Sequence, residues 1–311
     1  MNSYAFHINL YDVAFFGMLF VSFTFIVLLW FTKKVSQRAN RLLATAVAVV
    51  TLPIARILAI DVRLDVYIHS WSLLPLHFSL AFGPLIFFYV LKITQPENRF
   101  RATDMLHFSP LILELSAHLF AIIESKRTGV PTYDTLTFQR LDPILQLLVF
   151  VSVGIYLLYS YKLINRYYRR MKFYGGDRYH QGLRWLHNIL TGISMLWISG
   201  VFFSGMDYFY YHRTLSIHAY YPIYLLLGFG AIWIAALVHT RPDVCVVTDV
   251  PRPLKTLLPA DLKQKGVWLR KVTKENLYYQ DPDLSLTSLA EKLSISPHEL
   301  SRVINVALKK N

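Results

Sequence analysis

The sequence has few charged residues and almost no cysteine. Charged residues make up 16% of its 311 residues, while 54% are hydrophobic and 15% aromatic. Soluble domains usually carry about 25% charged residues, so this composition indicates a membrane protein. The single cysteine, Cys245, excludes an internal disulfide framework and a cysteine-based zinc site.

The sequence also lacks the short motifs of common catalytic and nucleotide-binding sites. No H-E-x-x-H, G-x-S-x-G or P-loop pattern occurs. Gly228 and Gly230 lie in an apolar stretch without a lysine to meet a phosphate. His77, Glu114 and His118 do not have the spacing of metal ligands. We therefore expect no catalytic residue, no metal site and no cofactor, and we interpret the protein as a non-enzyme.

Long hydrophobic stretches are abundant. Seven are long enough to cross a bilayer as helices, which takes about twenty residues. They are Val13–Phe31, Leu42–Ile60, Leu73–Leu91, Met105–Ile123, Pro143–Tyr161, Trp185–Met206 and Tyr221–Val238. The second and fourth are the weakest because they contain Arg56 and Glu114. The first has no basic residue before it and no small-residue cleavage pattern after it, so we expect a membrane anchor rather than a signal peptide.

Basic residues are distributed unevenly among the connections between these stretches. The connections after the first, third and fifth stretches are rich in Lys and Arg. The alternate connections hold only Arg63, Lys126, Arg127, Arg140 and Arg213. Because basic residues favour the cytoplasmic side, we expect the N-terminus outside and the C-terminus in the cytoplasm. Much of the net charge of +13 then reflects topology rather than binding to nucleic acid.

The C-terminal stretch from Asp281 to Asn311 has the pattern of two short helices joined by a tight turn. The first helix has an apolar stripe at helical spacing, formed by Leu286, Leu289, Ala290 and Leu293. Ser296 is a good N-cap, Pro297 suits the first helical position, and Glu299 completes a capping box. A second stripe follows at Leu300, Val303 and Ile304. The pattern predicts a helix-turn-helix, with a core of Ala290, Leu293, Leu300 and Ile304.

The stretch between the last hydrophobic segment and this motif divides into two parts. Residues 241–259 are rich in proline and are expected to form a semi-rigid linker. Leu262–Tyr278 has helical periodicity and is expected to pack against the helix-turn-helix. Its apolar side is predicted to hold Trp268, Leu269, Val272 and Leu277.

The run from Tyr279 to Leu293, continued by Ser294-Ile295-Ser296 and Leu300-Ser301-Arg302-Val303, resembles the first helix-turn-helix of AraC-type transcription regulators. The second helix of such a motif presents its outer face to the major groove. By the resemblance, His298, Ser301 and Arg302 match base-contacting positions, and Asn305 lies on the same outer face. The family's DNA-binding domain has two such motifs, so residues 260–311 correspond to part of it.

The membrane part resembles the multi-span sensor region that some bacteria fuse to AraC-type domains. The resemblance is carried by Phe82-Gly83-Pro84-Leu85, His107-Phe108-Ser109-Pro110 and His239-Thr240-Arg241-Pro242-Asp243. It implies a seven-span sensor over residues 1–240 and a one-component transcription regulator in the bacterial inner membrane. The expected partners are the lipid bilayer, DNA, an unidentified small-molecule or membrane signal, and a second copy of the chain in a homodimer.

Five ionisable residues fall in the outer half of the expected spans, where charge is costly and often functional. They are Arg56, His77, Glu114, His118 and Asp207. One hypothesis is a ligand pocket open to the outer side, in which Arg56 pairs with Glu114 or Asp207. The alternative is that Arg56, His77 and Asp207 reach the membrane interface by snorkelling. Glu114 and His118 share a helix face at i, i+4 spacing.

Three functions are compatible with these features. The first is the regulator described above. The second is a seven-helix receptor or transporter whose tail docks a protein partner rather than DNA, although the internal repeats common in transporters are not evident. The third is an integral-membrane enzyme that uses Glu114, His118 and Asp207. In every case the expected fold class is all-α: a seven-helix transmembrane bundle followed by a short cytoplasmic helical segment.

Overall fold

The computed structural model describes residues 9–32, 36–62, 77–98, 100–130, 132, 135–173, 184–240, 259–281, 284–293 and 295–307. The chain divides into two compact units, Met1–Val246 and Val247–Asn311, which are described separately below. All regular secondary structure in the described residues is helical, so the expected all-α class is confirmed.

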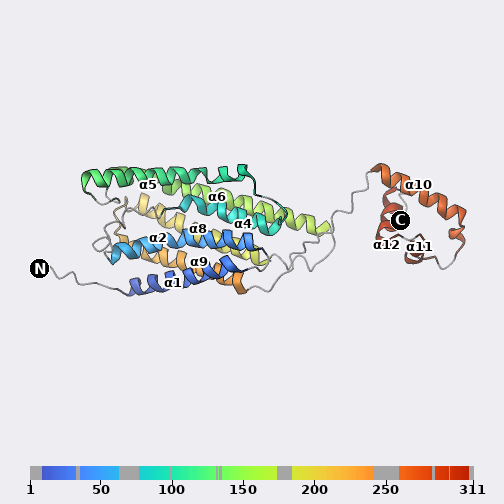
Figure 1. Cartoon of the computed structure of the whole chain (residues 1–311), viewed down its shortest axis with the longest axis horizontal. Coiled ribbons are helices and arrows are strands. Elements are labelled where there is room, and N and C mark those ends of the chain that lie inside the picture. The colour runs from blue at the N-terminus through green and yellow to red at the C-terminus, as the bar shows by residue number, and fades with distance from the viewer. Residues whose placement is uncertain are drawn as a thin grey trace. The chain divides into compact units, whose positions relative to one another are not determined.

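The first unit is a bundle of α-helices, labelled in Figure 1. Within the described residues these are α1 (Leu10–Phe31), α2 (Gln37–Asp61), α4 (Phe82–Thr94), α5 (Ser109–Thr128), α6 (Leu136–Phe173), α8 (Arg184–Phe209) and α9 (Tyr221–Thr240). Short 3-10 helices precede three of them: η2 (Ser79–Ala81), η3 (Ala102–Phe108) and η5 (Ile217–Tyr220).

Within the described residues, six helices are long and apolar enough to cross a membrane. These spans are Leu10–Phe31, Gln37–Asp61, Ala102–Thr128, Leu136–Arg169, Arg184–Phe209 and His218–Thr240. Each contains one of the expected hydrophobic stretches. Consistent with lipid around the bundle, large apolar side chains project outward, among them Phe16, Phe20, Leu113, Phe120, Leu158 and Phe202.

The third expected stretch, Leu73–Leu91, differs from the structure. Residues 73–76 lie outside the described part of the chain, and the helix consists of 3 residues in η2 followed by 13 in α4. Sixteen residues of helix rise about 24 Å, less than the roughly 30 Å of a bilayer core. The helix therefore does not qualify as a seventh span by length. Its first turn lies against α5, where the carboxylate of Glu114 accepts hydrogen bonds from the backbone N–H groups of Ser79 and Leu80.

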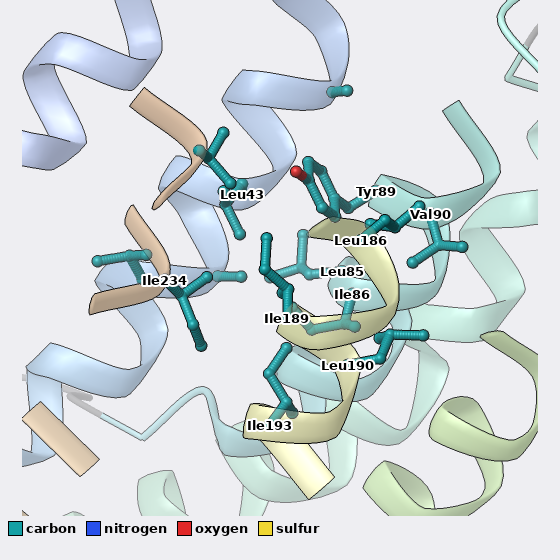
Figure 2. Close-up of a cluster of buried hydrophobic side chains, with 14 of the residues drawn as sticks. Leu43, Leu85, Ile86, Tyr89, Val90, Leu186, Ile189, Leu190, Ile193 and Ile234 are labelled. Atoms are coloured by element: carbon teal, nitrogen blue, oxygen red, sulfur yellow. The ribbon is translucent and has the colours of Figure 1, made fainter. Parts of the chain in front are cut away.

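The helices surround a common interior. Contacts run from α2 to α4, α4 to α6, α6 to α8, α8 to α9 and α9 back to α2, while α1 packs on α2 and α9 and α5 packs on α6. Figure 2 shows the centre of this packing. The labelled side chains come from α2, α4, α8 and α9: Leu43, Leu85, Ile86, Tyr89, Val90, Leu186, Ile189, Leu190, Ile193 and Ile234.

The second unit consists of short helices around a small core. They are α10 (Pro259–Glu275), η6 (Tyr278–Gln280), α11 (Leu286–Lys292), α12 (Pro297–Arg302) and the π-helical turn η7 (Val303–Ala307). The core side chains are Leu269, Leu289, Ala290, Leu300 and Val303. Leu293 and Ile304, expected in the core, are partly buried against it.

Two details of this unit differ from the sequence expectation. Trp268 and Leu277 remain 43% and 49% exposed, so Leu269 is the side chain of that stretch that enters the core. The Ser296 hydroxyl accepts the Glu299 N–H at 3.1 Å as expected. The Glu299 carboxylate, however, pairs with Lys265 of α10, which replaces the second half of the expected capping box with a contact between helices. The linker 241–259 lies outside the described residues except for Pro259, which begins α10.

Close contact between α4 and α6 depends on Gly83, because a Cβ there would lie 2.7 Å from Cδ2 of Tyr156 and 3.3 Å from the Ser152 hydroxyl. We expect Gly83→Leu to force the helices apart and to destabilise the bundle by about 1–3 kcal/mol. The matched control is Gly17→Leu on α1, where a Cβ meets nothing within 4 Å. Thermal unfolding in nanodiscs measures both variants. Equal Tm values would contradict the close approach.

Candidate functional site

A cavity of about 860 Å³ lies inside the first unit. Its walls come from α2, α4, α5, α6, α8 and α9. The volume falls within the range of about 300–1,000 Å³ that is common for pockets holding small organic ligands. The bundle is therefore built around an internal space large enough for a ligand.

Polar groups gather toward the end of the cavity where α4 and α9 begin and α2 and α8 end. The charged and polar lining residues there are Arg56, His77, Ser79, Glu114, His118, Asp142, Gln146, Ser204, Arg213, Tyr220 and Tyr224. Four of the five predicted pocket residues, all except Asp207, are thus brought to one cavity.

Glu114 is buried and caps the start of the helix that begins at Ser79. Its Oε1 accepts the N–H of Ser79 at 3.0 Å and its Oε2 accepts the N–H of Leu80 at 2.9 Å. Two of the backbone donors that a helix start leaves without an intrahelical partner are thereby satisfied. The carboxylate also lies at the positive end of the helix dipole. This arrangement accounts for an acidic residue in the middle of an apolar helix.

Arg56, His77 and His118 form a second group in the cavity. The Arg56 guanidinium contacts Nε2 of His77 and lies 5.4 Å from the ring centroid of Phe138. Because arginine only donates, His77 Nε2 is the acceptor in this contact, so the neutral ring carries its proton on Nδ1. The rings of His77 and His118 are 5.0 Å apart, which links α5 to the same group.

Asp142 and Arg213 form a third group, which the sequence analysis did not select. Arg213 donates to Oδ2 of Asp142 at 2.8 Å and to the carbonyl oxygen of Gln139 at 3.5 Å. Pro143 lacks the N–H that would otherwise bond this carbonyl in α6. Arg213 therefore donates a hydrogen bond to the Gln139 carbonyl in place of the N–H that Pro143 lacks. The acidic residue directly before a proline at the start of a hydrophobic stretch was the available sequence signal.

Asp207 lies next to the cavity rather than in its lining. The buried Asp207 accepts a hydrogen bond from the hydroxyl of Tyr220, and Tyr220 lines the cavity. The expected pairing of Arg56 with Glu114 or Asp207 is replaced by other contacts. Glu114 bonds to backbone N–H groups, Asp207 bonds to a tyrosine, and Arg56 contacts an imidazole. The physical reason is that η2 begins beside Glu114 and supplies its donors.

The predicted DNA-contacting residues lie on the second unit, in α12 and η7. His298 and Asn305 are exposed and Ser301 is half-buried. Asn305 Nδ2 approaches the Ser301 hydroxyl at 3.5 Å, one helical turn away. The side chain of Arg302 lies outside the described part of the structure. The exposed side chains of His298 and Asn305 point away from the buried core residues Leu300 and Val303, so these two are available to a partner.

Within the described residues, no group of three or more His, Cys, Asp or Glu side chains could hold a metal ion. Comparison with models of known protein families, with curated proteins and with solved structures finds no match for the chain. Its function must therefore be argued from its own residues.

The contacts of Glu114 predict a specific effect of mutation. Glu114→Ala removes both acceptors from a buried helix start, and hydrogen bonds to charged groups contribute about 1.5–3 kcal/mol each. We expect a lower Tm and faster hydrogen exchange at Ser79 and Leu80. Glu114→Gln keeps one carbonyl acceptor, so its Tm and its exchange rates at Ser79 and Leu80 should lie between those of the wild type and Glu114→Ala. Glu97→Ala, at an exposed position, is the control. Unchanged exchange at Ser79 and Leu80 in Glu114→Ala would exclude the cap.

Proposed function

We propose that the protein is a membrane-bound one-component transcription regulator. In this proposal the bundle senses a signal, and the second unit binds DNA in the cytoplasm as part of an AraC-like domain. Two features of the chain support the proposal together. Six helices are long and apolar enough to cross a membrane, and the C-terminal helices have the order and core spacing of a helix-turn-helix.

The packing of α11 and α12 carries the DNA-binding part of the proposal. Ala290 and Leu300 are almost fully buried between the two helices, and the N-cap Ser296 starts α12 directly after the turn. Buried apolar residues on one side leave His298 and Asn305 exposed on the other. A helix that is anchored in this way and polar on its outer face suits the major groove.

Signal transfer in this proposal depends on two packings of the bundle. A ligand that binds one packing more tightly shifts the population toward it. The cavity touches α9 at Ile223, Leu227, Ala231 and Ile234, and α9 is the last helix before the linker. A change in cavity contents therefore acts directly on the helix that leads to the second unit.

Topology completes the proposal. In this proposal the expected stretch Leu73–Leu91 is the seventh crossing, and an odd number of crossings puts the N-terminus outside and the C-terminus in the cytoplasm. Basic residues support this orientation, since Arg38, Arg41, Lys162 and Arg166 lie at the end of the bundle opposite Arg56 and Asp142. The cytoplasmic end is also where a DNA-binding unit meets its target.

DNA recognition predicts that single residues of the outer face determine specificity. The preferred site is first selected from a random DNA library with the full chain in nanodiscs. Arg302→Ala should then weaken binding to that site about tenfold or more, since a good base contact contributes about 1–3 kcal/mol of discrimination. The charge-matched control is Arg270→Ala on the exposed side of α10. Both variants should lose non-specific, salt-sensitive affinity to a similar degree.

A docking tail is the second candidate function, and one observation favours it. The second unit has a groove of about 480 Å³ beside α10, lined by Trp268, Leu269, Ile295 and Val303 among others, and Trp268 is 43% exposed. Recovery of no preferred DNA sequence from the library would overturn DNA recognition. In that case the wild type and Trp268→Ala would be compared for binding of a protein partner, and Trp268→Ala should bind more weakly because Trp268 lines the groove.

The proposed topology predicts which engineered cysteines are accessible. In a Cys245→Ser background, Lys126→Cys should react with a membrane-impermeant maleimide on spheroplasts, because α5 ends outside. Glu97→Cys, in the connection after α4, should react only after the membrane is permeabilised. Both positions are exposed in the structure, so burial does not confound the comparison. The reverse pattern would place the N-terminus in the cytoplasm.

A further inference from the structure

The cavity is polar in one half and apolar in the other. On α2 its lining runs from Leu43 to Ile60, and Arg56 lies about 20 Å along the helix axis from Leu43. The polar residues described above surround Arg56. Farther along, the cavity is lined by Leu43, Val47, Ile86, Val153, Ala231 and Ile234. The space is therefore long, with polar groups at one end and aliphatic side chains at the other.

Charged groups of both signs line the polar half, and each of them has a partner in the protein. Both carboxylates accept hydrogen bonds from the protein itself: Glu114 from two backbone N–H groups and Asp142 from Arg213. A cationic group entering the cavity would have to compete with these donors, and an anion at Arg213 would have to compete with Asp142. Two guanidinium groups, on Arg56 and Arg213, line the same region. Guanidinium stays charged in proteins and matches carboxylate or phosphate geometry with two parallel hydrogen bonds. This end of the cavity therefore suits an anion.

We propose that the cavity binds a single-chain amphiphile with an anionic head group, the simplest example being a fatty acid. The head group lies at Arg56 and Arg213, and the chain extends between α2, α6, α8 and α9 toward Leu43 and Ile234. A single chain fits the volume, which is that of a small-ligand pocket. This amphiphile would be the signal of the sensor, so its biological role rests on the proposed function.

Binding is measured on the full chain in nanodiscs, without DNA. The probes are saturated fatty acids of increasing length, with empty nanodiscs as the reference for partitioning into lipid. Each added methylene should tighten the saturable component about fourfold, from roughly 0.8 kcal/mol per buried CH₂, until the chain fills the cavity. A lysophosphatidic acid of equal chain length identifies whether carboxylate or phosphate is preferred. Absence of any saturable component would overturn the proposal.

Head-group recognition is tested with Arg56→Leu. Binding of dodecanoate should weaken about tenfold or more, from the 1.5–3 kcal/mol of a hydrogen bond to a charged group, while binding of neutral dodecanol should not change. Arg56→Lys should restore part of the affinity. The matched control is Arg41→Leu, on the exposed side of the same helix, which should behave as wild type. An equal loss of affinity for dodecanoate and dodecanol in Arg56→Leu would contradict a site for anions. Tighter binding of dodecyltrimethylammonium than of dodecanoate to the wild type would contradict it as well.

The position of the chain is tested with Ala231→Leu, which fills the apolar end. Affinity in this variant should stop rising at a shorter chain length than in the wild type, while short fatty acids bind unchanged. Because the comparison is made between ligands of one variant, a general loss of stability does not produce this pattern. An unshifted plateau would place the chain elsewhere. The DNA assay is separate, so fatty-acid binding without DNA recognition would disprove only the proposed regulator.

Discussion

The structure depends on satisfying backbone hydrogen bonds where water is scarce. In a bilayer core, every N–H and C=O group must find a partner within the protein. Helices achieve this along their length, but the start of α4 and the proline in α6 interrupt the pattern. Glu114 accepts the free N–H groups at Ser79 and Leu80, and Arg213 donates to the carbonyl of Gln139. Glu114 and Arg213 are thus explained first as hydrogen-bond partners for the backbone.

The same requirement creates the polar end of the cavity. The short helix η2 starts inside the bundle, where Glu114 caps it and Ser79 forms part of the lining. Arg213 reaches α6 from a turn in which His212 and Arg213 both have positive φ, and there it also pairs with Asp142. Structural and ligand-binding roles are therefore not exclusive here. A ligand that competes for Arg213 would loosen the contact between this turn and α6, which is a direct route from binding to helix packing.

Much of the fold follows from local properties of the sequence. Hydrophobic stretches located the six long helices, and helical spacing with an N-cap at Ser296 located α11 and α12. These features depend on neighbouring residues, which the sequence places together. The third expected stretch, Leu73–Leu91, differs from the observed helix, which runs from Ser79 to Thr94, because hydropathy does not show where a helix starts. At this start the N–H of Ser79 bonds to Glu114, which lies 35 residues away in the sequence.

The sequence by itself determined that the chain is helical, that it has stretches long and apolar enough to cross a membrane, and that Arg56, His77, Glu114 and His118 are unusual in their apolar surroundings. Only the tertiary structure decided what these groups contact. Arg56 meets His77 across 21 residues, and Arg213 meets Asp142 across 71. Such pairings depend on which helices become neighbours, a consequence of packing over the whole bundle. For the same reason Asp142 and Arg213 emerged as cavity residues only in three dimensions.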